Sequence, residues 1–288
     1  MDIQFETKID FKSPQWNRDA WARMHGDLNP DKEKITSCSG TILAVQAGTK
    51  VKEILGFESF LVTRLLPLEG GSYRRLNREV IYYRDVRSGE LIDQWTNPWT
   101  EEVVDVVQVA NDPFNYTISD TLILAPEDFG GDSKPEPRKI PLIFPWKRMN
   151  DETLTLTTDM HLYYPNALDP KKWVRESSGS MVQISEMMRY FVSIKDLENP
   201  KLTSVPHVGT WNRVTPWLPW MLMGDTPGHL LYMGTMTCAD NLDIVPKDAQ
   251  EYAQKHHPQF LSAPTEDYGP SLSSLELYAR NQTPAPAK

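Results

Sequence analysis

The sequence predicts a mainly β protein: a strongly bent antiparallel sheet or a partly closed barrel, with short helices at its ends. An α+β arrangement is the alternative. Three observations lead to this prediction. Short runs rich in Thr, Val, Ile, Leu and Tyr recur along the chain, turn residues separate these runs, and helical spacing of apolar residues is confined to a few short segments.

A helix is expected near the N-terminus, over residues 14–24. Ser13 offers a capping hydroxyl group, and Pro14 suits the first helical position, where no backbone N–H is needed. Gly26 is a suitable residue for the end of this helix.

Strands are expected to fill the rest of the first half of the chain. Turn formers such as Gly70-Gly71 and Asn97-Pro98 separate them, and strands at this spacing are typical of an antiparallel sandwich or barrel. The expected strands are residues 36–46, 57–66, 73–84, 90–96, 101–110 and 117–124.

A Pro/Gly-rich loop over residues 125–141 follows. We expect a single domain, 1–288, with halves 14–125 and 140–280 joined by this loop. Over residues 153–164, Thr, Asp and His alternate with Leu and Met, which predicts a half-buried strand. Further expected elements are strands at 172–177, 181–194, 205–213 and 229–237, a helix as the alternative over 185–194, and short helices at 216–223 and 246–256.

Composition excludes several classes of protein. With 30 Lys and Arg against 39 Asp and Glu, the net charge is −9, which argues against nucleic-acid binding. No apolar run is long enough to span a membrane, and no signal peptide is visible. Cys38 and Cys238 lie outside any metal or redox spacing, so reduced cysteines and a cytoplasmic location are expected.

Standard cofactor and catalytic motifs are absent from the sequence. There is no GxGxxG, P-loop or GxSxG, and the six histidines show no HExxH or HxH spacing. We therefore expect neither a cofactor nor a metal ion. The 9 Trp and 11 Met indicate instead an apolar, adaptable cavity for a small molecule.

An aromatic segment near residue 220 supplies most of the predicted cavity wall. Trp217, Trp220, Met221 and Gly224 recur at three- or four-residue spacing, so a short helix beginning at Pro216 would place them on one face. The alternative is that this helix plugs the end of the barrel as core. The predicted substrate-binding residues are Trp95, Trp211, Trp217, Trp220, Met221 and Met223.

Charged residues within apolar strands supply the predicted catalytic group. A carboxylate in an apolar cavity has a raised pKa and suits acid or base catalysis, and an arginine there can hold a substrate oxygen. Glu186 is the predicted acid or base, Arg175 or Arg213 the oxygen-binding group, and Asn97 a hydrogen-bond donor at the barrel rim. Structural ion pairs between strands, and an ordinary Asn-Pro turn, are the alternatives.

The sequence resembles an uncharacterised family, catalogued as a domain of unknown function with the serial number eighteen thirty-eight. The matching pieces run in order along nearly the whole chain: Asp19 to Arg23, Arg78-Glu79 with Tyr82, Trp95 to Pro98, Asn111 to Pro113, Trp173 to Ser177, Ser185-Glu186 and Pro216 to Gly224. The resemblance implies a compact fold. Members without an export signal resemble cytosolic proteins of natural-product pathways, where cyclases and pericyclases act without a cofactor.

These observations lead to one principal hypothesis. The protein is expected to be a cofactor-independent cyclase or isomerase, with a pericyclase of Diels–Alder type as one version, acting on a hydrophobic terpenoid or polyketide intermediate. The alternatives are a non-catalytic, lipocalin-like carrier of a lipophilic molecule, and a hydrolase or lyase using Glu186 and His161. The expected partner is the hydrophobic substrate; the oligomeric state is left open, with a homodimer as one option.

Overall fold

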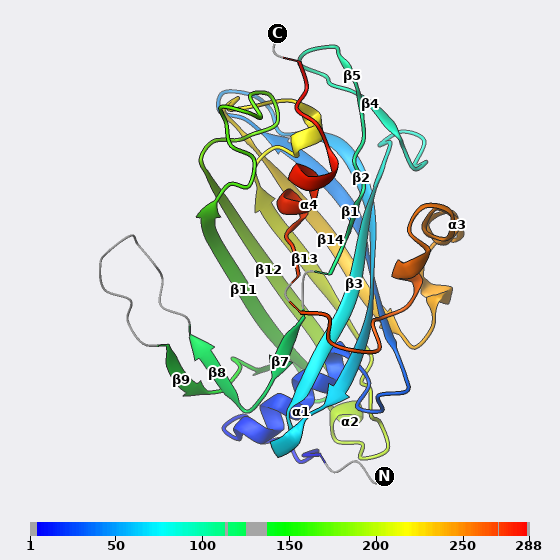
Figure 1. Ribbon diagram of the computed structural model, residues 1–288. Helices are drawn as coiled ribbons and strands as arrows, with labels where there is room; N and C mark the ends of the chain where they lie inside the picture. Colours follow the sequence, from blue (N-terminus) through cyan, green and yellow to red (C-terminus); the bar gives the residue numbers. More distant parts are fainter. Residues whose placement is uncertain (1–4, 113–114, 125–136, 270, 287–288) are drawn as a thin grey trace.

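Among the described residues, ten strands form one strongly bent antiparallel sheet (Figure 1). The computed structural model describes residues 5–112, 115–124, 137–269 and 271–286. The strand order is β10-β11-β12-β13-β14-β1-β2-β3-β6, with β7 also paired to β3. The long strands are β1 (Lys34–Val45), β2 (Lys52–Pro67), β3 (Tyr73–Arg84), β11 (Thr153–Pro165), β12 (Met181–Ser193), β13 (His207–Thr215) and β14 (His229–Ala239).

The remaining strands are short and lie at the edges. In the large sheet these are β6 (Val109–Asn111), β7 (Tyr116–Ile118) and β10 (Lys147–Arg148). Two further pairs lie outside it: β4 (Gln94–Thr96) with β5 (Val103–Asp105), and β8 (Thr121–Leu124) with β9 (Arg138–Pro141). The predicted mainly β class with a bent antiparallel sheet is therefore confirmed.

Strands from both halves of the chain belong to the same sheet. β1 and β14 pair over their whole length, from Ile35 opposite Ala239 to Val45 opposite His229. Near the middle of this pair, Gly40 lies opposite Gly234, and a Cβ atom on Gly40 would come within 1.9 Å of the Met233 carbonyl oxygen. The missing side chain lets the strands approach closely here.

Helices close or cover the ends and outer face of the sheet. α1 (Pro14–His25) lies at one end, and its first turn is capped by the Ser13 side chain, which accepts from the Trp16 N–H. α3 (Lys247–His256) packs through Ala249 and Ala253 on an outer-face cluster that contains Phe60. The short α2 (Ile194–Leu197) follows β12, and α4 (Ser274–Asn281) lies near the C-terminus.

Most of the long strands and two helices match their predictions, although β2 begins at Lys52, five residues before the expected start at 57. α1, α3, β3, β11 and β14 begin and end within two residues of the expected bounds. The alternating strand over 153–164 is confirmed, and 185–194 is mostly strand, not helix. The predicted runs 101–110 and 117–124 each break into two short strands, 90–96 is strand only over Gln94–Thr96, and residues 125–136 of the predicted loop lie outside the described residues.

Two predicted elements are wrong. Residues 172–177 are turns, because the Trp173 N–H bonds back to the Asp169 carbonyl and the Ser177 N–H bonds back to the Trp173 carbonyl. Residues 216–223 contain only a single 3₁₀ turn, Pro219–Met221. This turn ends at Leu222, whose φ of 56° and ψ of 37° are left-handed, so the chain cannot continue as a helix.

The bent sheet leaves a seam between its two edges. β11 and β3 lie near opposite ends of the strand order and are not paired with each other. Figure 1 shows α4 in front of this seam, between β11 and β3. The C-terminal segment thus lies where the sheet does not close on itself.

Candidate functional site

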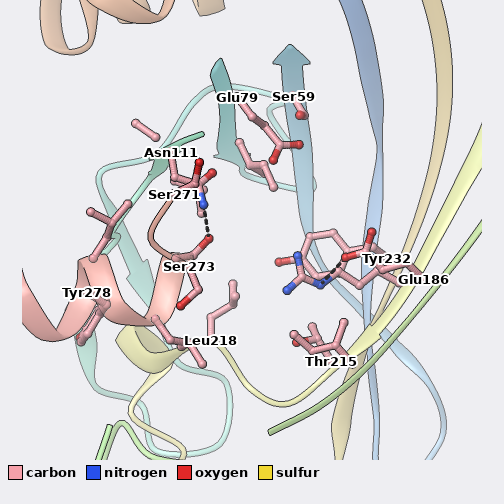
Figure 2. A pocket seen from close by; sticks show the side chains of 18 of the residues that line it. Ser59, Glu79, Asn111, Glu186, Thr215, Leu218, Tyr232, Ser271, Ser273 and Tyr278 are labelled. Carbon is pink, nitrogen blue, oxygen red and sulfur yellow. Dashed lines mark hydrogen bonds and ion pairs between the residues drawn. The ribbon is translucent and has the colours of Figure 1, made fainter. Parts of the chain in front are cut away.

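A large cavity lies on the inner, concave face of the bent sheet. Its volume is about 1520 Å³, larger than the ~300–1,000 Å³ of most small-molecule sites. Inward-facing residues of β1, β2, β3, β11, β12, β13 and β14 line it, together with the 216–220 segment and the C-terminal segment. Figure 2 shows that its polar side chains come from several strands: Ser59 from β2, Glu79 from β3, Glu186 from β12 and Tyr232 from β14.

Glu186 and Arg213 form the ionic centre of the cavity. They are register partners on β12 and β13, and Arg213 Nε lies 3.6 Å from Glu186 Oε1. The indole N–H of Trp211 donates to Glu186 Oε2 at 3.0 Å. Both carboxylate oxygens are therefore held from β13, which is the neighbourhood that a buried carboxylate requires. These three predicted site residues are brought together.

The Arg213 guanidinium has donors to spare. Its separation from Glu186 exceeds hydrogen-bond length, and Nε has no hydrogen-bond partner among the described residues. The side chain is a quarter exposed, within a cavity. Burial disfavours the charged form, but the Glu186 carboxylate together with Tyr232, Tyr83 and Glu79 outweighs that effect, so the pKa of Arg213 is raised. The charged guanidinium thus lines the cavity, and since Nε is itself sealed, the terminal Nη groups are the ones that can meet a ligand.

Glu79 is a second carboxyl group in the same cavity, and it was not among the predicted site residues. Burial raises its pKa from the ordinary 4.5 to about 7, and the negative charge of Glu186 adds to this rise. The positive charge of Arg213 and a hydrogen bond from Ser59 oppose the rise without cancelling it. Glu79 is therefore poised to exchange a proton near neutral pH.

The sequence contained a signal for Glu79, but the signal was ambiguous. The residue follows Arg78 within the predicted strand 73–84, and a structural ion pair was an equally valid interpretation. Glu79, Ile81 and Tyr83 point to the same face of β3. Only the register of β3 against β2 shows that this is the inner face. Arg78 lies on the opposite face of the strand, where its guanidinium donates to the Gln259 carbonyl.

Two tyrosines complete the wall near Arg213. Tyr232, on β14, is the register partner of Arg213, and its hydroxyl is hydrogen-bonded to that of Tyr83 on β3. Burial raises the pKa of Tyr232 well above its ordinary value, so this hydroxyl stays neutral. The pair can orient a polar substrate group without adding charge.

The floor of the cavity, the end closed by α1, carries two buried histidines, one of them the last residue of α1. Burial lowers the pKa of His207 to about 3, and it lowers the pKa of His25 well below the ordinary 6.5. His25 Nε2 lies 3.4 Å from the Tyr190 hydroxyl, and the His25 and His207 rings are 5.9 Å apart. Both imidazoles are neutral at physiological pH.

The predicted wall residues divide into two groups. Trp211, Trp217 and Trp220 line the cavity. Trp95, Met221 and Met223 are buried behind this wall and do not line it. The separation follows from the 3₁₀ turn, because a continuous helix would have placed Trp217, Trp220 and Met221 on one face.

Asn97 and Arg175 lie away from the cavity and hold loops. The Asn97 amide donates to the Met221 carbonyl at 2.9 Å, and its oxygen accepts the backbone N–H groups of Trp99 and Thr100. Arg175 is paired with Glu102 in an adjoining loop. Asn97 therefore has the structural role of a turn former, which was its alternative interpretation.

His161 lies on the outer face of the sheet, because it pairs with Ser185 and not with Glu186. Its Nδ1 is 3.0 Å from Ser185 Oγ, and its Nε2 is 3.0 Å from Asp159 Oδ2. More than half of the His161 side chain is exposed. The structure thus separates His161 from Glu186, contrary to the hydrolase or lyase hypothesis that joined them.

The fold and the cavity define a class: a bent antiparallel sheet around a large, largely apolar hollow that contains buried carboxyl and guanidinium groups. The chain belongs to the family described as "Protein of unknown function (DUF1838)", which matches residues 31–282. The resemblance that the sequence suggested is thereby confirmed. No curated protein matches the chain.

The described residues show neither a membrane-spanning helix nor a cluster of metal-ligand side chains. No helix there is both long enough and apolar enough to cross a bilayer. Within the same residues, no group of three or more His, Cys, Asp or Glu side chains is arranged around a common metal position.

Proposed function

We propose that the protein is a cofactor-independent isomerase or cyclase that moves a proton next to a carbonyl group of a hydrophobic substrate. One observation carries this proposal. Two carboxyl groups share the cavity in contrasting environments: Glu186 is held by Arg213 and Trp211, whereas burial leaves Glu79 with a pKa of about 7. Carboxyl groups separated in this way take different roles in acid–base catalysis.

The chemistry begins at Arg213. Its free N–H groups bind the substrate carbonyl oxygen, and Glu186 fixes the orientation of the guanidinium. The Glu79 carboxylate then removes a proton from the carbon beside the carbonyl. The electron pair of the broken C–H bond forms a C=C bond, and the carbonyl oxygen takes up the negative charge, which Arg213 stabilises.

The second half of the reaction consumes this enolate. In an isomerisation, protonated Glu79 returns its proton to a different carbon of the conjugated system. In a cyclisation, the enolate carbon attacks a second carbonyl carbon of the same molecule, and Glu79 protonates the new alkoxide. Both routes regenerate the Glu79 carboxylate and need no other reactant.

The cavity wall supports a large apolar substrate. Trp211, Trp217 and Trp220 line it with Met188 and Met236 from the strands. Tryptophan and methionine offer broad, adaptable apolar contact. A terpenoid or polyketide with at least one carbonyl group fits this volume and polarity, and the walls would hold its chain in a reactive conformer.

Solvent deuterium tests the proposal. Purified protein is incubated in D₂O with metabolites from a strain that lacks its gene, and mass spectrometry identifies a consumed compound and its product. In an isomerisation we expect deuterium on the carbon that Glu79 protonates, because the carboxyl proton exchanges with D₂O while the enolate persists. A cyclised product should gain deuterium only on its new, exchangeable hydroxyl group, whereas unreacted substrate should gain it on the carbon beside the carbonyl. Glu79→Gln should abolish turnover, because the amide cannot accept the proton.

Glu58→Gln is the matched control. Glu58 also has a pKa raised to about 7 by burial, but it lies on the outer face of the sheet with Ser37 and Arg84. This variant should keep full turnover. Binding without consumption would indicate the carrier instead. Turnover that survives Glu79→Gln but fails in Trp217→Ala would indicate a pericyclase that acts by shape.

A further inference from the structure

We propose that the C-terminal segment, residues 271–286, is a removable cover through which ligands reach the cavity. This inference deepens the proposed function, because it rests on the cavity being a ligand site. Residues of this segment, including Ser273 and Tyr278, form part of the cavity wall (Figure 2).

The cover bridges the seam of the sheet and is fastened on both sides. On the β3 side, the Asn111 amide of β6 donates to Ser274 Oγ at 3.1 Å, and the Asn115 amide donates to Ser271 Oγ at 2.7 Å. On the β11 side, Glu176 of the β11–β12 connection accepts the Ala285 N–H at 2.6 Å. These are isolated polar contacts, two between side chains and one from a backbone N–H to a side chain, unlike the paired backbones of the sheet.

The helix of the cover is locally capped and shallowly seated. Ser273 and Glu276 form a capping box, so its first turn satisfies its own backbone groups. None of the residues of α4 is buried, although Tyr278 packs edge-on against Trp173. Moving the segment outward breaks few buried contacts of α4 itself, chiefly the one between Tyr278 and Trp173, and regions with few buried contacts open at low free-energy cost.

The closed state also leaves two acceptor atoms unsatisfied at the fastening points. Asn111 Oδ1 and Glu176 Oε2 are sealed from solvent and have no hydrogen-bond partner among the described residues. Both side chains are only 4% exposed. An unpaired buried acceptor destabilises the state that contains it, so opening, which admits water to these atoms, is favoured.

Cys38 provides a native reporter of opening. It lines the cavity, is 6% exposed, and burial raises the pKa of its thiol to about 12. Because little of this thiol is ionised, N-ethylmaleimide alkylates Cys38 slowly compared with the opening and closing of the cover. The alkylation rate is then proportional to the fraction of molecules whose cover is open. Cys238 is buried but does not line the cavity, so mass spectrometry of the two peptides gives an internal reference.

Three full-length variants test the cover. Ser271→Ala with Ser274→Ala removes two fastenings and should speed alkylation of Cys38 roughly ten-fold. Asn111→Cys with Ser274→Cys, joined by a short bis-methanethiosulfonate linker, should slow it by a similar factor until dithiothreitol cuts the linker and is removed. Ser88→Ala, in the exposed β3–β4 connection, should leave the rate unchanged.

Equal Cys38 rates in the loosened, linked and control proteins would overturn the proposal. Binding of the dye Nile red is measured in parallel. If Nile red binds while the Cys38 rates do not differ, the cover is wrong and the ligand cavity stands. If the rates differ as expected while neither Nile red nor any metabolite binds, the cover stands and the proposed function fails.

Discussion

Arg213 and Glu186 face each other across β13 and β12 at 3.6 Å, close enough to pair their charges but too far apart for a hydrogen bond. Trp211, two residues away on the same strand, donates to the other oxygen of Glu186. The carboxylate is thus fixed from two directions, while the guanidinium keeps N–H groups for a ligand. The following predictions test the account that depends on this arrangement.

The pairing of Glu186 with Arg213 should be visible in stability. Glu186→Leu leaves the buried guanidinium without its counter-charge and should lower the free energy of unfolding by about 3 kcal/mol. The double variant Glu186→Leu with Arg213→Met should lose less than the sum of the single variants, as a double-mutant cycle in urea would show. Additive losses would mean that the two charges do not interact.

Glu79 should make stability depend on pH. Its pKa is about 7 in the fold against an ordinary 4.5, so the folded state binds a proton that the unfolded state has lost. The free energy of unfolding should therefore be highest below pH 4.5 and should fall as the pH rises from about 4.5 to 7. The total fall due to Glu79 is at most about 3 kcal/mol. In urea unfolding, the free energy of unfolding of the wild type should fall over this pH range, and that of Glu79→Gln should not show this fall. Parallel pH profiles would contradict the raised pKa.

His207, buried at the floor of the cavity, should make stability depend on pH in the opposite direction. His207 has its pKa lowered from 6.5 to about 3, so below pH 6.5 the unfolded state takes up a proton that the fold excludes. This contribution to stability is full above pH 6.5 and falls by about 2 kcal/mol between pH 6.5 and 5. His207→Gln should make that acid limb shallower in urea unfolding, with His25 still contributing to it, and His256→Gln, at an exposed position, should leave it unchanged.

Asn97 should matter for stability and not for ligand binding. Asn97→Ala removes hydrogen bonds to the Met221 carbonyl and to the N–H groups of Trp99 and Thr100, so a loss of about 2–4 kcal/mol is expected. The affinity for Nile red should stay within about two-fold of wild type, since its side chain does not line the cavity. If Asn97→Ala were as stable as the wild type but bound Nile red more weakly, Asn97 would have a role in ligand binding and this prediction would be wrong.

The sequence predicted the elements whose residues alternate or are capped over a long stretch. β11 has thirteen residues with a regular alternation, and α1 has Ser13 as its cap, so local chemistry decides both. The 216–223 segment has helical spacing, yet the left-handed Leu222 ends it after one turn. Tertiary packing, which spacing does not report, determines that turn.

Sequence patterns identified only those site residues that stand out within their own segment of the chain. Trp211, Glu186 and Arg213 were each singled out from a local pattern, and the pairing of β12 with β13, which the sequence did not predict, brings them together. Glu79 was missed because the face of a strand depends on its register. Asn97 and Arg175 bind partners 124 and 73 residues away in the sequence, Met221 and Glu102, which no local pattern reveals.

The most direct test is the binding of Nile red, a neutral apolar dye that carries a carbonyl group, to wild type, Arg213→Met and Arg189→Met. Arg189 is the matched control, because it lies on the outer face of β12 beside Thr157. We predict saturable binding with blue-shifted emission, about ten-fold weaker in Arg213→Met and unchanged in Arg189→Met. Absence of saturable binding, or equal affinity in all three proteins, would contradict a ligand cavity centred on Arg213.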